Sequence, residues 1–444
     1  MDIRETAERY VAECLKKGAD AAEVYVESGR RLSVRIRNGA VETVQESAGR
    51  GAGFRVFVKN AMAFAHSNDL SEKTCEEAIE RAISFARITT PDPNNILPDD
   101  PGVGDAGPLY DPEIETIPLE RKIDLALRAE ETALKDPRIT LSGGASYGEG
   151  EGEIALANSH GLLKSYRATS CSFGVSVVAA KDDERSSGGE SCGRRFFADL
   201  KTVPEVAEKA AWKAWRMLGA KPVKTQRASV VFDADVAYAL LGGILGAVNG
   251  ERVLQGASFL AGKIDQKIGS GLMTLIDDGL RPKGPGSAPF DGEGVPKRTR
   301  VIVEKGVLRS YLYNTIVAAR AGVQSTGNAS RGGFSGLPGI GPHNFYMEAG
   351  IHKPEDIVRA TRRGLLVTEV TGYGINPVNG HFSGGVAGFW IENGKIAHPV
   401  RGLTAAGSAA EMLNGIDMVG NDLDLNRGLT APTFRIRELQ IGGV

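Results

Sequence analysis

Cysteine and long apolar runs are scarce in this chain. Four cysteines occur among 444 residues, at positions 14, 75, 171 and 192, and none forms a Cys-x-x-Cys pair. We therefore expect no disulfide framework and a reducing, cytoplasmic location. The longest nearly uncharged apolar run covers thirteen residues, 236–248, whereas a membrane-spanning helix needs about twenty. The first residues, Met-Asp-Ile-Arg-Glu-Thr-Ala-Glu, also lack the basic start and apolar core of a signal peptide, so no membrane association is predicted.

An excess of charge of either sign is absent as well. Lys and Arg number 53 and Asp and Glu number 55, which gives a formal net charge of −2. Such a balance supplies no positive field for phosphates, so we predict no nucleic-acid partner. Aromatic residues make up only 6% of the chain, but glycine occupies 57 positions, well above its usual share of about 7%. The composition is typical of a globular protein that is rich in turns and close backbone contacts.

Histidine is the residue whose scarcity bears most on chemistry. Only six occur, and no two lie within five residues of each other, so the H-E-x-x-H pattern that holds zinc on one helical face is missing. Distant ligands can still converge in space, and His343 with His381 is the pair to check. Residues 189–193, Gly-Glu-Ser-Cys-Gly, match G-x-S-x-G, but that motif needs a strand-to-helix elbow, and we expect a loop within an antiparallel unit. Cys192 stays open as a nucleophile, although a small buried apolar role is the simpler interpretation.

The first half of the chain, residues 1–220, is predicted to be one α+β domain. A helix over 6–17 is followed by alternating strands, an Asn38-Gly39 turn and a helix over 75–86. The next segment, 89–118, is rich in Pro, Asp and Gly, which predicts a long surface linker.

Residues 118–220 then repeat that order. Leu119, Ile123, Leu127 and Leu134 recur at helical spacing on one side, which predicts a helix over 119–134. Strands are expected over 139–147, 153–157 and 172–180, and the capping box Thr202-x-x-Glu205 opens a closing helix. We interpret 1–90 and 118–220 as two related helix–strands–helix units, although any two α+β segments can be aligned loosely.

Residues 221–444 are predicted to form a second, β-rich domain. An apolar helix over 234–248 is followed mainly by strands, with short helices over 354–363 and after the capping box Ser408-x-x-Glu411. The expected strands cover 229–232, 273–277, 299–304, 365–371, 388–392 and 433–441. The predicted fold class is therefore α+β, with a duplicated N-terminal α/β half and a mainly antiparallel, barrel-like C-terminal domain.

Two glycine-rich loops are the candidate binding segments. Residues 324–346 are dense in small polar groups and glycine, and residues 372–385 have a similar texture. Such loops can approach a peptide backbone closely and donate hydrogen bonds to it. A mobile surface loop is the alternative interpretation.

Four segments of the C-terminal half carry a family resemblance. They read Gly-Tyr-Gly-Ile-Asn-Pro-Val-Asn-Gly at 372–380, Ser-Gly-Gly-Val-Ala-Gly-Phe-Trp-Ile-Glu-Asn-Gly at 383–394, Val-Gly-Asn-Asp-Leu at 419–423 and Pro-Thr-Phe-Arg-Ile at 432–436. In order and spacing they closely resemble the TldD/TldE (PmbA) family. The resemblance implies a cytoplasmic metallopeptidase-type protein that acts in removing leader peptides from modified peptide antibiotics and in degrading an unstructured antitoxin. An older label for the family is modulator of DNA gyrase.

The same resemblance implies two kinds of subunit. The TldD subunit bears an H-E-x-x-x-H helix and a later Cys that hold one metal, and the TldE/PmbA subunit lacks them. Here Gly242, Gly243 and Ala247 stand where the first His, the Glu and the second His would be, and no Cys follows Cys192. Because zinc binding needs three or four good donors, we expect a chain of the TldE/PmbA branch that binds no metal, with the zinc held by a TldD-type partner.

The leading functional hypothesis is thus one subunit of a peptidase heterodimer, with no catalytic residue assigned in this chain. An extended peptide would be held by backbone hydrogen bonds along a sheet edge, between the two glycine-rich loops. The predicted substrate contacts are Asn328, Ser330, Arg331, His343 and Asn344.

Two other functions stay open at this point. One is a self-sufficient hydrolase that uses Cys192 or a metal site at His343 and His381. The other is a non-enzymatic modulator of DNA gyrase. A homodimer of the chain alone is also compatible with the sequence.

Overall fold

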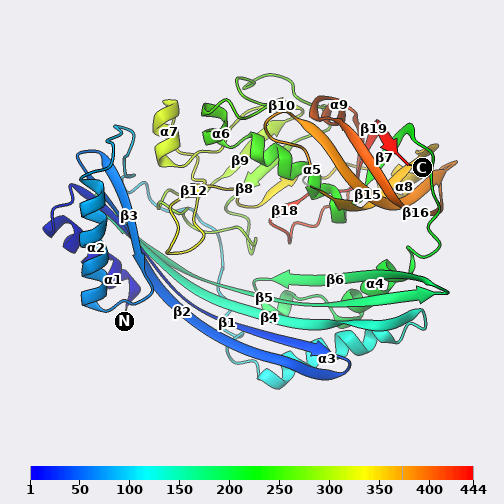
Figure 1. The fold of residues 1–444 in the computed structure, drawn as a ribbon, viewed down its shortest axis with the longest axis horizontal. Helices are drawn as coiled ribbons and strands as arrows, with labels where there is room; N and C mark the ends of the chain where they lie inside the picture. Colours follow the sequence, from blue (N-terminus) through cyan, green and yellow to red (C-terminus); the bar gives the residue numbers. More distant parts are fainter. Residues whose placement is uncertain (1, 373, 444) are drawn as a thin grey trace.

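The first half of the chain folds around one long, curved sheet. The computed structural model describes residues 2–372 and 374–443, so Tyr373 of the segment 372–380 lies outside the described residues. The strands are β1 (Ala21–Arg37), β2 (Ala40–Val58), β3 (Ala61–Ser67), β4 (Ile139–Asn158), β5 (Leu163–Lys181) and β6 (Glu184–Arg194). They pair in the order β3-β2-β1-β4-β5-β6, with every pair antiparallel. The sheet curves beneath the rest of the molecule (Figure 1).

Two helix pairs cover the outer face of this sheet. α1 (Ile3–Lys16) and α2 (Glu72–Ala86) pack at one end and share a core with β1, β2 and β3. α3 (Leu119–Leu134) and α4 (Val203–Trp215) pack at the other end on β4, β5 and β6. The central strands β1 and β4 join the two units from Glu23↔Asn158 to Ile36↔Ala145. The predicted α+β class, with two helix–strands–helix units, is confirmed.

The buried side of α3 is not the side that carries Leu119 and Leu134. The buried residues are Lys122, Ala126, Ala129, Glu130 and Ala133, whereas Leu119 and Leu134 are exposed and Ile123 and Leu127 are only partly buried. The charged side chains have partners: Lys122 Nζ lies 2.7 Å from a carboxylate oxygen of Glu149, and Glu130 accepts hydrogen bonds from both N–H groups of the Asn38-Gly39 turn. The predicted helix over 119–134 forms. Small alanines let it approach the sheet, and leucine periodicity does not reveal charged partners on another strand.

Residues 89–118 contain no helix or strand, as expected for a linker, but they are not a free surface loop. Leu109 and Ile114 are buried in the structure. The N–H of Gly104 donates to the carbonyl of Pro289 in the second half, and the N–H of Thr169 donates to the carbonyl of Leu109. The segment is therefore a strap that is fixed to both halves of the protein.

The second half contains a closed barrel. Its strands are β7 (Gln226–Phe232), β14 (Arg363–Thr371), β15 (His381–Glu392), β16 (Lys395–Ser408) and β19 (Phe434–Gly442), with β17 (Ile416–Val419) paired to β19. The ring runs β16-β15-β14-β7-β19 and closes through β16–β19. Only the β7–β14 pair among these is parallel. The barrel-like C-terminal domain is thus confirmed.

A smaller sheet and five helices complete this half. The sheet runs β10-β9-β8-β13-β18, and β11 pairs with β12. Their bounds are β8 (Leu275–Asp278), β9 (Thr299–Glu304), β10 (Val307–Leu308), β11 (Ala329–Ser330), β12 (Gly339–Ile340), β13 (Phe345–Met347) and β18 (Leu429–Thr430). The helices of the described residues are α5 (Ala234–Ala247), α6 (Gly250–Leu254), α7 (Thr315–Ala321), α8 (Pro354–Arg359) and α9 (Ala409–Asn414). α5 packs into the main core of this half.

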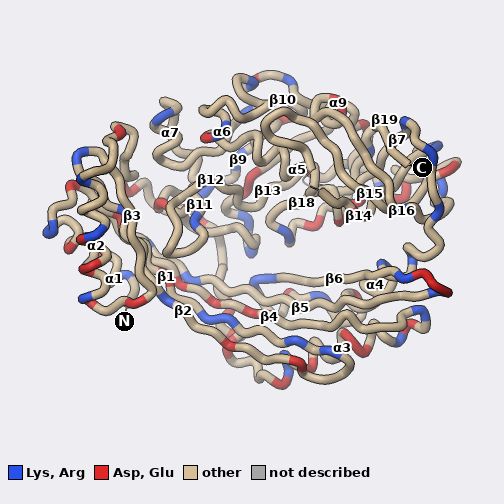
Figure 2. Tube along the Cα trace, in the orientation of Figure 1, with Lys and Arg blue, Asp and Glu red and all other residues tan. Residues whose placement is uncertain are grey.

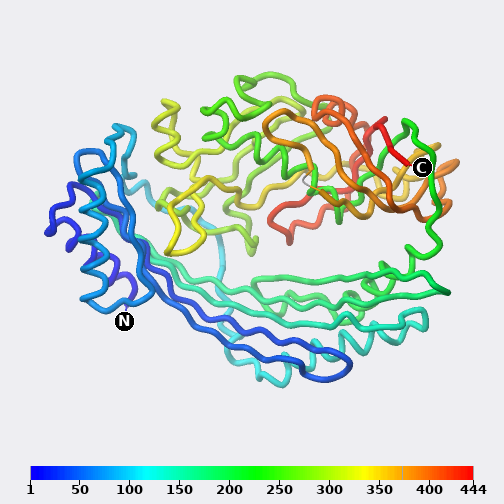
Figure 3. The backbone as a smooth tube through the Cα atoms, in the orientation of Figure 1, coloured from blue at the N-terminus to red at the C-terminus, as the bar shows by residue number. Residues whose placement is uncertain are grey.

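The C-terminal half lies over the concave face of the long sheet, and the chain passes from the first half to the second near residue 220 (Figure 3). This arrangement leaves the inner face of the sheet opposite the loops of the second half. Among residues 2–372 and 374–443, no helix combines the length and the apolar character that crossing a membrane requires.

Candidate functional site

α5 carries Gly242, Gly243 and Ala247, the positions at which the resemblance places the metal-binding residues of the TldD subunit. Gly242 is exposed, and a Cβ added there would meet nothing within 4 Å. Gly243 is buried, and a Cβ there would lie 2.3 Å from the carbonyl oxygen of Ile375. Ala247 is fully buried in the core. Because none of these side chains has a donor atom, and Gly243 and Ala247 are buried, the residues present do not fit a metal ion.

The small residues of α5 instead form a seat for one of the family-motif segments. Three residues on one side of the helix, Ala239, Gly243 and Gly246, contact Gly374, Ile375 and Pro377 in turn. A Cβ on Gly374 would lie 2.4 Å from the carbonyl oxygen of Ala239, and a Cβ on Gly246 would lie 3.0 Å from the Cβ of Pro377. Close backbone approach therefore explains Gly243 and Gly246, but it does not explain Gly242.

The other candidate chemical groups are buried or separate. No group of three or more His, Cys, Asp or Glu side chains could hold a metal ion in the part of the chain that the structure describes. Cys192 is 2% exposed and its Sγ accepts a hydrogen bond from the N–H of Lys201. It lies on β6, an edge strand of an antiparallel sheet, so residues 189–193 form no nucleophile elbow. His381 is exposed on β15.

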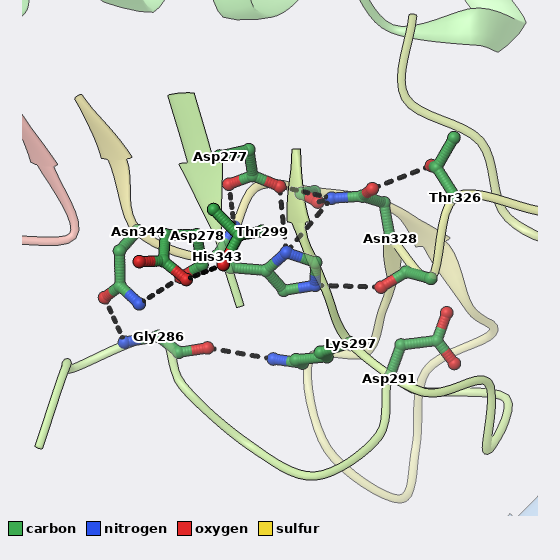
Figure 4. A network of polar contacts seen from close by, with 12 residues as sticks. Asp277, Asp278, Gly286, Asp291, Lys297, Thr299, Thr326, Asn328, His343 and Asn344 are labelled. Atoms are coloured by element: carbon green, nitrogen blue, oxygen red, sulfur yellow. Dashed lines mark hydrogen bonds and ion pairs between the residues drawn. The ribbon is translucent and has the colours of Figure 1, made fainter. Parts of the chain in front are cut away.

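His343 and Asn328, two predicted substrate contacts, belong to a buried polar network (Figure 4). Asp277 Oδ2 lies 2.8 Å from Nδ1 of His343 and accepts a hydrogen bond from Nδ2 of Asn328 at 2.7 Å. Nε2 of His343 lies 2.8 Å from the carbonyl oxygen of Gly327. Burial opposes ionisation of Asp277, but the hydrogen bond and charge of His343 outweigh it and lower the pKa of this carboxyl. Both ring nitrogens of His343 are thus engaged within the protein.

Asn344, a third predicted contact, supports a neighbouring loop rather than facing solvent. Its Oδ1 accepts a hydrogen bond from the N–H of Gly286 at 2.9 Å, and its Nδ2 donates to Oγ of Ser287 at 2.9 Å. Lys297 Nζ donates to the carbonyl of Gly286 at 2.9 Å, and burial lowers the pKa of this lysine to about 8. The network therefore holds the loop 283–287 in place (Figure 4).

The remaining predicted contacts are Arg331 and Ser330. The guanidinium of Arg331 forms an ion pair with Glu23 of β1, and its side chain is 2% exposed. Glu23 also pairs with Arg55 at 2.7 Å, and Arg55 pairs with Glu293 at 2.9 Å, all with side chains 1% exposed or less. This buried chain of alternating charges ties the long sheet to the second half. Ser330 alone among the five predicted contacts is exposed.

A cleft lies between the concave face of the sheet and the second half. It consists of three adjoining hollows of about 570, 520 and 680 Å³. Gly193, Arg194 and Asn426 are common to the first and middle hollows, and Arg31 and Arg195 are among those common to the middle and third. We call this continuous space the sheet cleft.

The floor of the sheet cleft is made of very small side chains. Side chains alternate between the two faces of a strand. Gly148, Gly150 and Gly152 of β4 therefore leave one face without side chains, and Glu149 and Glu151 point to the other face. The positions paired with these glycines on the neighbouring strands are also small, except for Arg31, which pairs with Gly150. The lining includes Ser33, Ser47, Gly49, Ala168, Ser170, Ser172, Gly174, Gly189, Ser191 and Gly193. A peptide backbone can therefore lie close to this face.

Arg195 connects the floor of the cleft to its roof. Directly after β6, its guanidinium donates hydrogen bonds to the carbonyls of Gly284, Pro285 and Ser287 at 2.8, 3.0 and 2.8 Å. Lys283 and Pro285 of the same loop line the middle hollow. The sequence interpretation did not include this site, although the alternation Gly-Glu-Gly-Glu-Gly-Glu over 148–153 was a signal for a strand with one bare face.

Comparison with known proteins agrees with the resemblance of the motif segments. Profiles of PmbA/TldA metallopeptidases match residues 22–87 (domain 1), 112–218 (central domain) and 225–443 (C-terminal domain). The chain belongs to the TldD/TldE (PmbA) metallopeptidase family. Among its relatives, the metalloprotease PmbA of Escherichia coli O157:H7 is 32% identical over 99% of this chain and 96% of its own length. The PmbA homolog of Haemophilus influenzae is 31% identical over 98% and 95%.

Solved structures share the whole fold. TldE from Thermococcus kodakarensis superposes with a TM-score of 0.88 at 25% identity, over 99% of this chain and 100% of that one. A Bacteroides thetaiotaomicron protein, described as a proposed modulator of DNA gyrase, gives a TM-score of 0.91 at 28% identity over 100% of both chains.

Proposed function

We propose that this chain is the TldE/PmbA-type subunit of a metallopeptidase complex that hydrolyses unfolded or leader peptides, and that it holds no metal itself. The observation that carries the proposal is the lack of metal ligands on α5. Its position in the family fold is retained, but Gly242, Gly243 and Ala247 offer no ligand, and the backbone of Ile375 fills the space beside Gly243. A variant metal site would keep at least some donors.

A TldD-type chain is the proposed partner, and its zinc would activate the attacking water. The relatives support a pairing of two family members. Haemophilus influenzae has both a PmbA homolog and a TldD homolog among the relatives of this chain, and so does Buchnera aphidicola of the aphid Acyrthosiphon pisum. This chain would then contribute peptide binding.

The free edge of β6 is the proposed binding element for the peptide. β6 is the last strand of its sheet, so no further strand pairs with its outer edge among the residues described. Gly189, Ser191 and Gly193 of this strand line the sheet cleft. An extended peptide can add to such an edge through backbone hydrogen bonds, which do not depend on the side chains of the peptide.

The proposal is tested by reconstitution. An unstructured peptide is incubated with this chain, with a TldD-type partner, and with both, and the products are followed by mass spectrometry. Hydrolysis is expected only when the partner is present, and replacing the first His of the partner's H-E-x-x-x-H helix by Ala should abolish it. Metal-dependent turnover by this chain alone would contradict the proposal.

A further inference from the structure

The middle hollow of the sheet cleft carries an excess of positive charge. Arg31 rises from the floor, Arg194 and Arg195 lie at the end of β6, and Lys283 lies in the roof loop. In the described residues no carboxylate oxygen comes within 4.0 Å of a side-chain nitrogen of these three arginines. Lys283 pairs with Asp199 at 2.6 Å. Basic residues lie at the end of β6 and on the part of the second half that faces it (Figure 2).

Among the residues that the structure describes, no acidic side chain projects into the same hollow. Glu149 is the one acidic residue of its lining, and its carboxylate turns to the opposite face of the sheet. There it lies 2.7 Å from Lys122 of α3, and its side chain is 9% exposed. The two ends of the cleft differ from the middle. Asp235 is surrounded by cations in the first hollow, and Glu27 lines the third.

The floor itself can offer few other contacts. Backbone N–H and C=O groups in the interior of the sheet are already paired with neighbouring strands, and glycine has no side chain. Serine hydroxyls and the guanidinium of Arg31 are therefore the recognition groups of this floor. A guanidinium binds a carboxylate through charge-assisted, often bidentate hydrogen bonds.

We infer that the middle hollow binds carboxylate side chains of the bound peptide, so that this subunit selects acidic segments. The inference rests on the proposed function, because it assumes that the sheet cleft holds the peptide. It concerns the side chains of the peptide, whereas the edge of β6 binds the backbone. Peptides that carry Asp or Glu where they pass Arg31 and Lys283 should bind more tightly than neutral ones.

The test is a binding measurement that needs no catalysis. Fluorescence anisotropy follows the full chain with a short Gly/Ser peptide that contains glutamates and is blocked at both ends, and with its glutamine counterpart. The glutamate peptide should bind at least about tenfold more tightly at low salt, and the difference should shrink as salt screens the charges. Arg31→Gln should remove most of this preference, so that the glutamate and glutamine peptides bind with similar affinity.

Arg30→Gln is the matched control. Arg30 is the adjacent residue, but it points to the other face of the sheet and pairs with Glu46 at 2.6 Å, so the same change in net charge should leave the preference intact. Equal binding of the two peptides, or an equal effect of the two variants, would overturn the inference but leave peptide binding standing. If neither peptide bound, the assignment of the sheet cleft as the peptide site would fail as well.

Discussion

Two neighbouring glycines of α5 should respond in opposite directions to the same substitution. In a helix interior, Ala is favoured over Gly by about 1 kcal/mol. Gly242→Ala should therefore raise the free energy of unfolding by about that amount, because its Cβ would point into open space. Gly243→Ala gains the same helical preference, but its Cβ would lie 2.3 Å from the carbonyl oxygen and 2.5 Å from the Cβ of Ile375.

The contact at Gly243 is with backbone, so it cannot be relieved by a side-chain rotation. Overpacking of this kind costs about 1–3 kcal/mol. Because the helical preference is common to both variants, the difference between them measures the clash alone and should be about 1–3 kcal/mol. Gly246→Ala, with a Cβ 3.0 Å from that of Pro377, should fall between the two.

Urea unfolding followed by circular dichroism and by tryptophan fluorescence measures these differences. The reasoning is refuted if the two alanine variants have the same stability, or if Gly243→Ala is the more stable. Either result would mean that the segment 374–377 does not pack on α5, and that the backbone of Ile375 does not fill the space beside Gly243.

Three further predictions follow from the buried charges and from α5. Arg55→Met should lower the free energy of unfolding by about 3–5 kcal/mol, because it leaves the buried carboxylate of Glu293 without its cation; a calorimetric loss below about 1 kcal/mol would refute this. Burial opposes ionisation of Asp235, but Lys213 and other cations outweigh it and lower its pKa. Its stabilisation is therefore present above the unfolded pKa of about 4 and is lost as the pH falls further. The melting-temperature difference between the wild type and Asp235→Asn should accordingly shrink between pH 6 and pH 3, and a constant difference would contradict it. Combined Gly242→His and Ala247→His substitutions should destabilise the chain without creating hydrolysis, since position 247 is fully buried; metal-dependent cleavage by that variant would show the opposite.

Local signals in the sequence were sufficient for most elements of the fold. β9 has the predicted bounds, 299–304, and the capping boxes at Thr202 and Ser408 both form. The helix from Pro354 ends at Arg359, earlier than predicted, because the chain from Arg363 joins the barrel by pairing with β15. Periodicity and capping are properties of adjacent residues, so a single sequence contains them.

The sheet cleft could not be predicted in the same way. Arg31, Arg194 and Lys283 come from three distant parts of the chain and meet only because the second half folds over the sheet. Likewise, the chemistry of Asn328, His343 and Asn344 suggested ligand contacts, but their partners, Asp277 and the loop 283–287, lie far away in sequence. Polar residues in a glycine-rich loop look the same whether they bind a ligand or fix a neighbouring loop.

The metal content of the purified chain tests the central claim most directly. The chain is exposed to excess zinc, passed through gel filtration and analysed by inductively coupled plasma mass spectrometry. It should retain far less than one zinc per chain, and a TldD-type partner treated in parallel should retain one. One tightly held zinc per chain of this protein would contradict the account.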